Sequence, residues 1–463
     1  MTAPLKVAII GAGPAGIYAG NILSTSAPAA GRDAEVDLIE ALPAPYGLIR
    51  YGVAPDHPRI KGIVNSLHEM LDSGTIRLLG NVTFGIDVTL GDLATHYDAV
   101  IFATGATRDA SLEIPGVDLP GSFGAAEFVS WFDGHPDVAR DWPLDATDIA
   151  VIGNGNVALD VARMLAKHAE DLLPTDIPDT VYRSFAGSPV TDVHIFGRRG
   201  PAQIKFTPIE LRELNDIPDV DIVVYDEDFA EDTQPAAVAV GNNQLKVMTR
   251  TLRGWLTPGS KVASRRLHLH FFHAPVQILG DGRVESIRFE RTELTAEGTL
   301  HGTGKFVDYP VQAVYRAVGY CGSPLPGVPF DDARGVISNV EGRVIDGSGD
   351  ILPGLYTTGW IKRGPVGLIG HTKSDASETV AHLLADLLEA KPIDRTEVDR
   401  TDIVDLLRAR GVDYTTWQGW IALDAHERAL GDADLSGVPR IRVKVVPRDE
   451  QVGISLGRSV LAR

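Results

Sequence analysis

Short apolar runs, each followed by apolar residues at helical spacing, occur at two places along the chain. The first run is Lys6-Val-Ala-Ile-Ile-Gly11, and the stretch 17–24 after it has the spacing of a helix. A second strand is predicted at 35–40. This order of strand, helix and strand predicts a β–α–β unit.

The same pattern begins again in the middle of the chain. The run Asp148-Ile-Ala-Val-Ile-Gly153 is followed by a helical stretch at 157–168 and a strand at 193–197. Between the two units, the proline- and glycine-rich segment 113–121 is typical of a crossing between domains. Other predicted elements are strands at 98–103, 267–272, 286–290, 311–318 and 355–358 and a helix at 374–388. We therefore predict an α/β fold with two Rossmann-like dinucleotide-binding domains, the first completed by the returning chain.

The glycine-rich loop after the first strand reads Gly11-Ala12-Gly13-Pro14-Ala15-Gly16. In a strand–loop–helix setting, the first glycine permits a tight turn, the second lets the backbone approach a pyrophosphate, and the third lets the helix pack on the strand. Glu40 ends the next strand, where a carboxylate accepts hydrogen bonds from ribose hydroxyls and repels a 2′-phosphate. FAD or NAD fits this loop. The small residues around Thr104 and Gly105 suit close packing against a flavin nucleotide.

The second loop reads Gly153-Asn154-Gly155-Asn156-Val157-Ala158, with alanine in the third glycine position. The strand after it ends in Arg198 and Arg199 instead of an acid. Two guanidinium groups suit bidentate contact with a phosphate, so this site is predicted to prefer NADPH to NADH. The glycine loop and the two arginines are separated by more than the usual ~20 residues. The segment 171–189 is expected to form an excursion that accounts for the additional length.

Composition narrows the possible functions. The 463 residues suffice for two domains, and Cys321 is the only cysteine, which excludes a disulfide, a Cys-x-x-Cys redox pair and a cysteine-ligated iron–sulfur cluster. We assign no residue to a metal. The net charge of −19 argues against nucleic-acid binding. No run reaches the ~18 apolar residues of a membrane span, and the chain enters its first strand without a leader, so we expect no membrane insertion and a cytoplasmic location.

Five segments together resemble adrenodoxin reductase and the similar bacterial ferredoxin–NADP reductases. They span most of the chain from Lys6 to about Leu387 and are residues 45–58 (PYGLIRYGVAPDHP), 153–163 (GNGNVALDVAR), 197–201 (GRRGP), 206–213 (FTPIELRE) and 359–367 (GWIKRGPVG). The resemblance implies an FAD-binding domain of residues 1–106 plus 331–463, with an NADP-binding domain of residues 107–330 inserted into it. The segment after residue 390 matches little, and we predict for it a structural role only.

The resemblance also implies roles for individual residues. Contacts with the flavin are expected from Leu48, Val82, Phe84, Trp360, Gly367, Leu368 and Ile369. Residues 154–157 would receive the NADP pyrophosphate, and Glu210 would join the two arginines. Gly367 precedes a predicted helix whose positive end would stabilise charge near N1 of the reduced flavin.

Three polar residues are candidates for catalytic roles. His57 and Glu213 are expected near the nicotinamide, where they would position the substrate or relay a proton. The alternatives are a histidine that caps a loop and a glutamate in solvent. Asp160 is either a first-helix anion that assists or a structural cap.

The predicted activity is hydride transfer from NADPH to FAD N5, followed by single-electron transfer to a ferredoxin-type iron–sulfur protein. A flavin monooxygenase, an electron supplier like the small subunit of glutamate synthase and a non-enzymatic redox sensor remain alternatives. Ferredoxins are acidic, so transient electrostatic binding requires a locally positive surface. Candidates for it are Lys205, Arg212, Arg265, Arg266, Lys362 and Arg363.

Overall fold

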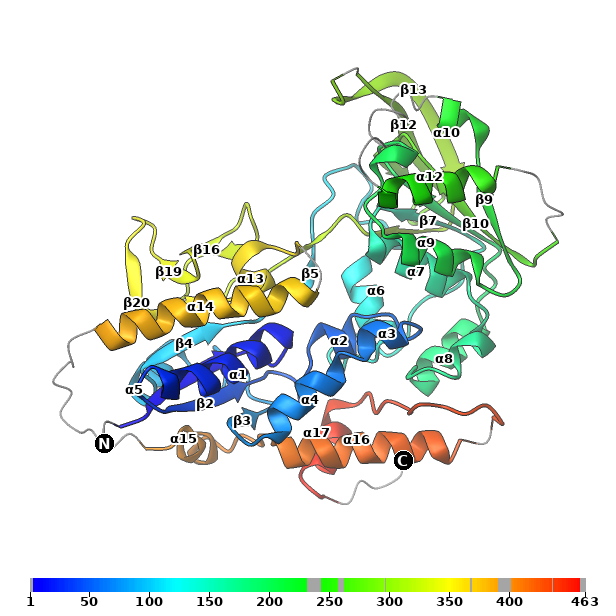
Figure 1. The fold of residues 1–463 in the computed structure, drawn as a ribbon. Helices are drawn as coiled ribbons and strands as arrows, with labels where there is room; N and C mark the ends of the chain where they lie inside the picture. The colour runs from blue at the N-terminus through cyan, green and yellow to red at the C-terminus, as the bar shows by residue number, and fades with distance from the viewer. Residues whose placement is uncertain are drawn as a thin grey trace. The chain divides into compact units, whose positions relative to one another are not determined.

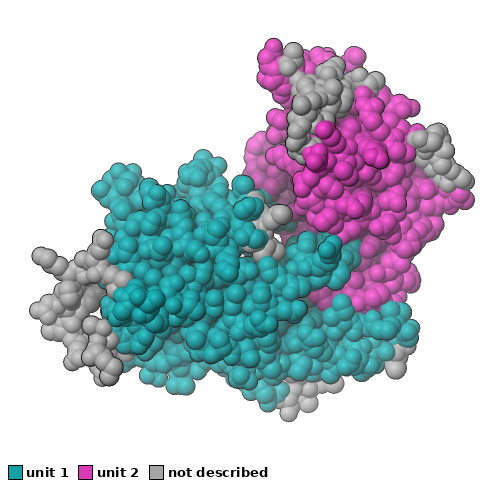
Figure 2. All heavy atoms as spheres, viewed as in Figure 1, with its two compact units in different colours: residues 1–108, 133–137, 320–463 teal, residues 109–132, 138–319 magenta. Residues whose placement is uncertain are grey.

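A computed structural model describes residues 3–230, 243–256, 262–295, 297–366, 369–389, 401–434 and 436–458. The chain divides into two compact units (Figure 2). Unit 1 comprises Met1–Arg108, Asp133–Asp137 and Tyr320–Arg463, and unit 2 comprises Asp109–Phe132 and Val138–Gly319. Unit 1 is therefore built from both ends of the chain.

Unit 1 contains a seven-stranded sheet in the order β18-β19-β20-β4-β1-β2-β3. The strands from β20 to β3 are parallel, and β18 and β19 extend the sheet in antiparallel fashion. Strand β20 comes from the C-terminal part of the chain, so the returning chain completes the first sheet. The strands are β1 (Leu5–Ile10), β2 (Ala34–Ile39), β3 (Ile76–Leu79), β4 (Ala99–Phe102), β18 (Asn339–Val340), β19 (Arg343–Ile345) and β20 (Ile351–Thr357).

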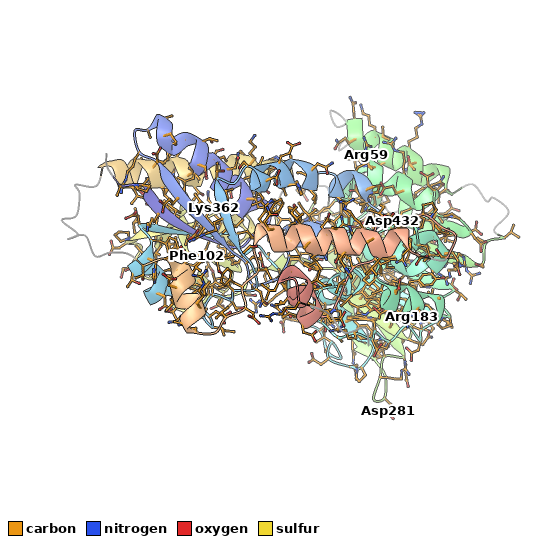
Figure 3. All side chains as sticks on the ribbon, turned by 90° about the horizontal axis from the view of Figure 1, so that it is seen from below. Arg59, Phe102, Arg183, Asp281, Lys362 and Asp432 are labelled. Atoms are coloured by element: carbon orange, nitrogen blue, oxygen red, sulfur yellow. The ribbon has the colours of Figure 1, made fainter. Side chains whose placement is uncertain are left out.

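Both faces of this sheet are covered, as a parallel sheet requires. Successive side chains of β1 alternate between two cores: Val7 and Ile9 belong to one, and Ala8 and Ile10 to the other. Helices α1 (Pro14–Ala29) and α14 (Ile369–Glu389) lie side by side over the first face (Figure 1). Phe102, labelled in Figure 3, ends β4 within the second core.

The remaining elements of unit 1 surround the sheet. The segment after residue 400, for which no secondary structure was predicted, forms three helices, α15 (Ile403–Ala409), α16 (Trp417–Asp432) and α17 (Arg448–Ser455). The others are α2 (Leu48–Tyr51), α3 (Pro58–Lys61), α4 (Val64–Asp72), α5 (Leu90–His96), β16 (Phe330–Asp331), β17 (Val336–Ile337) and α13 (Trp360–Arg363).

Unit 2 contains a six-stranded sheet in the order β6-β14-β7-β8-β10-β9, and each pairing in it is parallel. Helix α7 (Asn156–Ala166) packs against β8 and β10. The strands are β6 (Ser122–Gly124), β7 (Asp148–Ile152), β8 (Asp192–Phe196), β9 (Val220–Val224), β10 (Arg265–His270) and β14 (Ala313–Arg316).

A three-stranded antiparallel sheet packs on the six-stranded one. It consists of β11 (His273–Leu279), β12 (Ser286–Leu294) and β13 (Leu300–Pro310), of which the sequence predicted only part of β12. Phe196 and Phe289 stack at this junction with ring centroids 4.1 Å apart. Unit 2 also contains α6 (Ala125–Phe132), η1 (Ala169–Leu172), α8 (Asp179–Ala186), η2 (Pro201–Gln203), α9 (Pro208–Asn215), α10 (Asp226–Ala230) and α12 (Asn243–Gly254).

The fold class predicted from the sequence, α/β with two Rossmann-like parallel sheets, is confirmed. The predicted excursion at 171–189 lies between α7 and β8 and contains the helix α8. Two short strands, β5 (Arg108–Asp109) and β15 (Tyr320–Cys321), lie where the chain passes from one unit to the other.

Candidate nucleotide sites

The first glycine loop has the geometry of a phosphate cradle. Gly11 has φ +109°, and a Cβ there would lie 2.6 Å from the carbonyl oxygen of Ala103. A Cβ on Gly16 would collide with the backbone of Gly11. At Gly13, by contrast, a Cβ would meet nothing within 4 Å. Gly11 and Gly16 are thus required by the fold, whereas Gly13 leaves open space at the start of α1, where a pyrophosphate fits.

Glu40 follows β2 directly and lies beside this loop. Its carboxylate accepts hydrogen bonds from the main-chain N–H of Ala12 (2.6 Å) and of Leu42 (3.0 Å). Burial raises the pKa of Glu40, while these main-chain donors act in the opposite direction. In dinucleotide-binding folds, an acidic residue at the position of Glu40 contacts a ribose.

The turn before α2 packs on the same loop. The N–H of Tyr46 donates to the carbonyl of Ala12 at 2.8 Å. Gly47 has φ +50°, and a Cβ there would lie 3.1 Å from Cα of Gly13. Leu48, a predicted flavin contact, begins α2 immediately afterwards and is partly exposed. Gly47 was not singled out in the sequence, although it lies inside the family motif 45–58.

A buried ion pair joins this turn to the C-terminal helices. Arg50, in α2, donates to both carboxylate oxygens of Glu427 at 3.0 and 2.5 Å. Glu427 lies in α16 with no exposed surface, and Arg442 contacts it at 3.3 Å. Tyr46 packs edge-on against Trp420 of the same helix, with ring centroids 5.5 Å apart. Helix α16 therefore fixes the turn that closes over the glycine loop.

A second turn, at Gly359, packs on the start of α1. Gly359 has φ +77°, and a Cβ there would lie 2.6 Å from Cβ of Ala15. Asp375 in α14 accepts hydrogen bonds from the N–H of Gly359 (2.5 Å) and the hydroxyl of Thr358 (3.1 Å). Trp360, a predicted flavin contact, is the first residue of α13 and is partly exposed. Asp375 thus holds the turn that presents Trp360.

Three more of the predicted flavin contacts, residues 367–369, come shortly after Trp360 in the sequence. Gly367 and Leu368 lie outside the described residues. Ile369 is the first residue of α14, so the helix predicted after Gly367 is present.

The other predicted flavin contacts differ in exposure. Val82 and Phe84 are only 1% and 8% exposed and belong to the core beneath the sheet. Val82 is therefore covered by protein, and its main-chain N–H donates to the carbonyl of Glu40 at 2.9 Å. Thr104 and Gly105 follow β4 and are partly exposed, and the α-carbon of Gly105 has free space on its Cβ side.

His57 precedes α3 and is 4% exposed. Its side chain makes no capping hydrogen bond to that helix. The two roles considered for His57, at the nicotinamide and as a loop cap, both stay predictions.

The second glycine loop repeats the geometry of the first. Gly153 has φ +151°, and a Cβ there would collide with the carbonyl of Ala317. A Cβ on Gly155 would meet nothing within 4 Å, and α7 begins at the next residue, Asn156. A Cβ on Gly197 would lie 3.0 Å from the side-chain amide of Asn154, so the end of β8 lies directly against this loop.

Arg198 and Arg199 follow β8, and both are exposed. The hydroxyl of Thr292 donates to the carbonyl of Arg198 at 2.8 Å and so holds the main chain in place. Two equivalent loops are thus followed by opposite charges, an acid in unit 1 and two bases in unit 2.

The acidic candidates of unit 2 cluster around α7. Asn156 donates to Glu210 at 3.3 Å, which joins Glu210 to the glycine loop. Asp160 pairs with the buried Arg163 at 2.9 Å, and Glu213 lies 3.8 Å from the same guanidinium. The side chain of Glu213 is 34% exposed. Asp160 lies beyond the first turn of α7 and orients Arg163.

A hollow of about 590 Å³ in unit 1 is lined by residues including Asp37, Arg77 and Asp402. It includes the amino-terminal ends of β1 and β2, whereas the glycine loop follows the carboxyl end of β1. Ligands of open α/β sheets bind at the carboxyl ends of the strands, so this hollow is not the dinucleotide site.

The basic residues considered for partner binding are not all available. Lys362, labelled in Figure 3, is 7% exposed and pairs with Asp375 at 3.1 Å and Glu378 at 2.5 Å, so its assignment to a docking surface was wrong. Arg265 is half-buried and donates to the carbonyl of Ala166. Lys205 and Arg212 are exposed.

Comparison with known proteins places these two sites in a family. The NADPH-ferredoxin reductase FprA of Mycobacterium tuberculosis is 41% identical over 466 residues, covering 98% of this chain and 100% of that protein. The mitochondrial NADPH:adrenodoxin oxidoreductase of Bos taurus is 38% identical over 451 residues, covering 94% and 89%. This chain belongs to the family of NADPH-ferredoxin and adrenodoxin reductases. The resemblance inferred from the motifs is confirmed.

The structural comparison agrees with this family. The solved structure of M. tuberculosis FprA in complex with NADPH matches with a TM-score of 0.91, at 41% identity, and covers 98% of this chain and 100% of that one. A family model described as pyridine nucleotide-disulphide oxidoreductase matches residues 5–198. Within that wider family this chain cannot be a disulfide reductase of the paired-cysteine type, because its sequence contains one cysteine. No helix among the described residues has the length and apolar character needed to cross a bilayer.

Proposed function

We propose that this enzyme is an FAD-dependent ferredoxin–NADP reductase that takes a hydride from NADPH and delivers electrons singly to a ferredoxin-type iron–sulfur protein. Residues 1–106 and 331–463 form its FAD-binding domain, and residues 107–330 form its NADP-binding domain. The observation that carries the proposal is the contrast between the two loops: Glu40 follows one and Arg198 and Arg199 follow the other. Only the second tolerates a 2′-phosphate.

In the FAD-binding domain, the residues act by holding a nucleotide in place. The free space at Gly13 admits the pyrophosphate, which the N-terminal end of α1 attracts. Glu40 then accepts hydrogen bonds from ribose hydroxyls. Leu48 and Trp360 lie on the two turns that pack against the glycine loop, and they flank the flavin in this proposal.

In the NADP-binding domain, the main chain at Gly155 approaches the second pyrophosphate. Arg198 and Arg199 neutralise the 2′-phosphate, and Glu210 fixes Asn156 at the start of α7. Glu213 and Asp160 act through Arg163, which they orient. His57 belongs to the other domain and is a candidate for placing the nicotinamide.

Bound FAD supplies the capacity to accept a hydride and to release its two electrons one at a time. The protein itself supplies no nucleophile for this reaction. Its contribution is the orientation of both nucleotides and the electrostatic environment around them.

The identity of the acceptor is supported by the names of the relatives, which are reductases of ferredoxin and adrenodoxin. A one-cysteine chain cannot ligate its own iron–sulfur cluster with cysteines, so the cluster must belong to a partner. We further propose that binding of the partner is transient and electrostatic, that the enzyme does not bind nucleic acid, and that it works in the cytoplasm.

Anaerobic stopped-flow spectroscopy tests the proposed function. The purified protein is expected to show a flavin spectrum, to be bleached faster by NADPH than by NADH, and to recover its absorbance on mixing with oxidised ferredoxin. Absence of flavin, or equal rates with both nucleotides, would overturn the assignment. Replacing His57 and Glu213 in turn, with the same readout, decides whether either contributes to flavin reduction.

The reaction with oxygen distinguishes the proposed reductase from the principal alternative, a flavin monooxygenase. A monooxygenase couples oxygen consumption to a hydroxylated product, whereas a reductase is expected to show only slow, uncoupled oxidation of NADPH in air. Rapid NADPH-dependent reduction of ferredoxin would also exclude a non-enzymatic redox sensor.

A further inference from the structure

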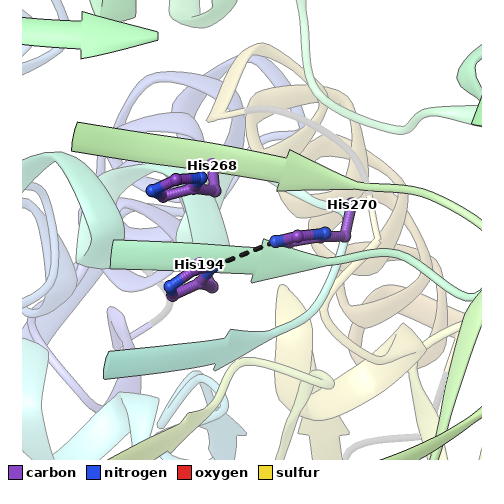
Figure 4. A group of neighbouring side chains, drawn as sticks. All are labelled: His194, His268 and His270. Carbon is purple, nitrogen blue, oxygen red and sulfur yellow. Dashed lines mark hydrogen bonds between the residues drawn. The ribbon is translucent and has the colours of Figure 1, made fainter. Parts of the chain in front are cut away.

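Three histidines project from one face of the six-stranded sheet in unit 2 (Figure 4). His194 lies on β8 and is paired in register with His268 on the neighbouring strand β10. His270 is two residues farther along β10 and therefore lies on the same face. None of the three belongs to the glycine loops or to the residues proposed to bind a nucleotide.

The donor atoms of these residues are close enough to share a ligand. Nδ1 of His194 lies 3.0 Å from Nε2 of His270, and one ring nitrogen from each of the three residues lies within 4.8 Å of the others. Two nitrogens bound tetrahedrally to zinc at about 2.0 Å are about 3.3 Å apart. The pair His194 and His270 is close to this spacing. The rings of His194 and His268 are stacked, with centroids 4.2 Å apart and an interplanar angle of 16°, so these rings must turn before the three nitrogens converge on one ion.

A carboxylate orients the third histidine. Asp192 lies 2.9 Å from Nε2 of His268 and is held in turn by Arg266 at 2.6 Å. With Nε2 donating to the carboxylate, the lone pair of His268 is on Nδ1, and Nδ1 lies 2.7 Å from the hydroxyl of Tyr225. A carboxylate bonded to the outer nitrogen of a histidine is the usual support for a metal-bound imidazole.

Burial lowers the pKa of two of the three histidines and so favours the neutral imidazole, the form that binds a metal. Burial lowers the pKa of His194 to about 3 and that of His270 well below its ordinary value. The ring of His270 is packed between Phe196 and Tyr225, with centroids 4.5 and 4.6 Å away.

We propose that His194, His268 and His270 form a binding site for a divalent transition metal of the zinc class, with the three imidazoles as its protein ligands. The hydroxyl of Tyr225 competes for Nδ1 of His268 and must move when the metal binds. The metal would tie β8 to β10 only a few residues before Arg198. Its role is then to stabilise the NADP-binding domain and not to take part in hydride transfer.

The test uses the full chain without an affinity tag, treated with EDTA and titrated with Zn²⁺ alone by calorimetry. We expect one equivalent to bind with micromolar or tighter affinity and to raise Tm. His194→Gln is expected to weaken binding by at least about tenfold, since it removes one ligand of the pair. His301→Gln changes an exposed histidine paired with Glu293 and is expected to leave the affinity unchanged.

Two further measurements keep the proposal falsifiable if His194→Gln fails to fold. Tyr225→Phe removes the competing hydroxyl and is expected to bind Zn²⁺ more tightly than the unaltered protein. Zinc-edge X-ray absorption of the unaltered protein is expected to show at least three nitrogen ligands with imidazole scattering. Absence of stoichiometric binding, unchanged affinity in His194→Gln, weaker binding in Tyr225→Phe, or a first shell of oxygens would each overturn the proposal.

Discussion

Single side chains at the ends of two strands account for the difference between two otherwise similar loops. Glu40 is buried and hydrogen-bonded to the main chain of the first loop. Arg198 and Arg199 are exposed beside the second, where only Gly197 allows the strand end to approach Asn154 so closely. In the proposed function, selection between a dinucleotide with and without a 2′-phosphate depends on these three residues, while the loops supply the pyrophosphate binding that is common to both.

Replacing both arginines by alanine is predicted to abolish most of the preference for NADPH. A hydrogen bond to a charged group contributes about 1.5–3 kcal/mol, and about 1.4 kcal/mol corresponds to a factor of ten. We expect kcat/KM for NADPH to fall by at least about tenfold while the value for NADH stays nearly constant. Arg288→Ala, which breaks an exposed pair with Asp308 in the same unit, is the control. An unchanged ratio of the two values would show that the arginines do not bind the phosphate.

Among the secondary-structure elements, the C-terminal helices have a defined part in unit 1. Helix α16 contributes Glu427, whose carboxylate accepts from Arg50 and from the main-chain N–H of Val445. Lys444, 4% exposed, donates to the carbonyl of Arg50 at 2.9 Å. These contacts fix α2 and the turn over the first glycine loop.

Glu427→Gln is predicted to destabilise unit 1 strongly. Removing one charge from a buried ion pair costs about 3–5 kcal/mol, because the partner guanidinium is left uncompensated. Urea denaturation measures the change in the free energy of unfolding. Unfolding is monitored by the fluorescence of the flavin that is released. Asp432→Asn makes the same chemical change at an exposed position of the same helix and is expected to have little effect. Equal midpoints for the two variants would contradict the role given to Glu427.

Local sequence patterns predicted the elements that carry the nucleotide loops, but not the contacts that hold them. The pattern located β1, β7 and β8 because their short apolar runs and terminal glycines are local signals. The pair of Arg50 and Glu427 joins residues 377 positions apart, and no local pattern reports such a contact. For the same reason Lys362 was assigned to the surface, although tertiary packing buries it between two acids.

The protein as a whole carries a net charge of −19, which opposes association with an acidic ferredoxin. The proposed electrostatic binding therefore needs exposed basic groups that offset the repulsion locally. Lys205 and Arg212 remain available for this, whereas Lys362 does not.

Electron transfer to ferredoxin is accordingly predicted to slow as ionic strength rises. At 0.1–0.15 M salt, the attraction between exposed charges is largely screened beyond about 8–10 Å. The measurement is the second-order rate constant for ferredoxin reduction between low and high salt. Ferricyanide reduction by the same samples controls for salt effects on NADPH oxidation itself. A rate constant that is independent of salt would rule out an electrostatic dock.

The central claim is that the two glycine loops bind different nucleotides, and one paired experiment tests it most directly. Gly13→Val and Gly155→Val each fill space that is empty of protein within 4 Å of a Cβ, so both variants are expected to fold. Bound flavin is read from the visible spectrum, and NADP⁺ binding is measured by calorimetry. The account predicts that Gly13→Val loses flavin but still binds NADP⁺, whereas Gly155→Val keeps flavin but no longer binds NADP⁺. The account would be contradicted if Gly13→Val retained its flavin. It would also be contradicted if Gly155→Val lost its flavin but still bound NADP⁺.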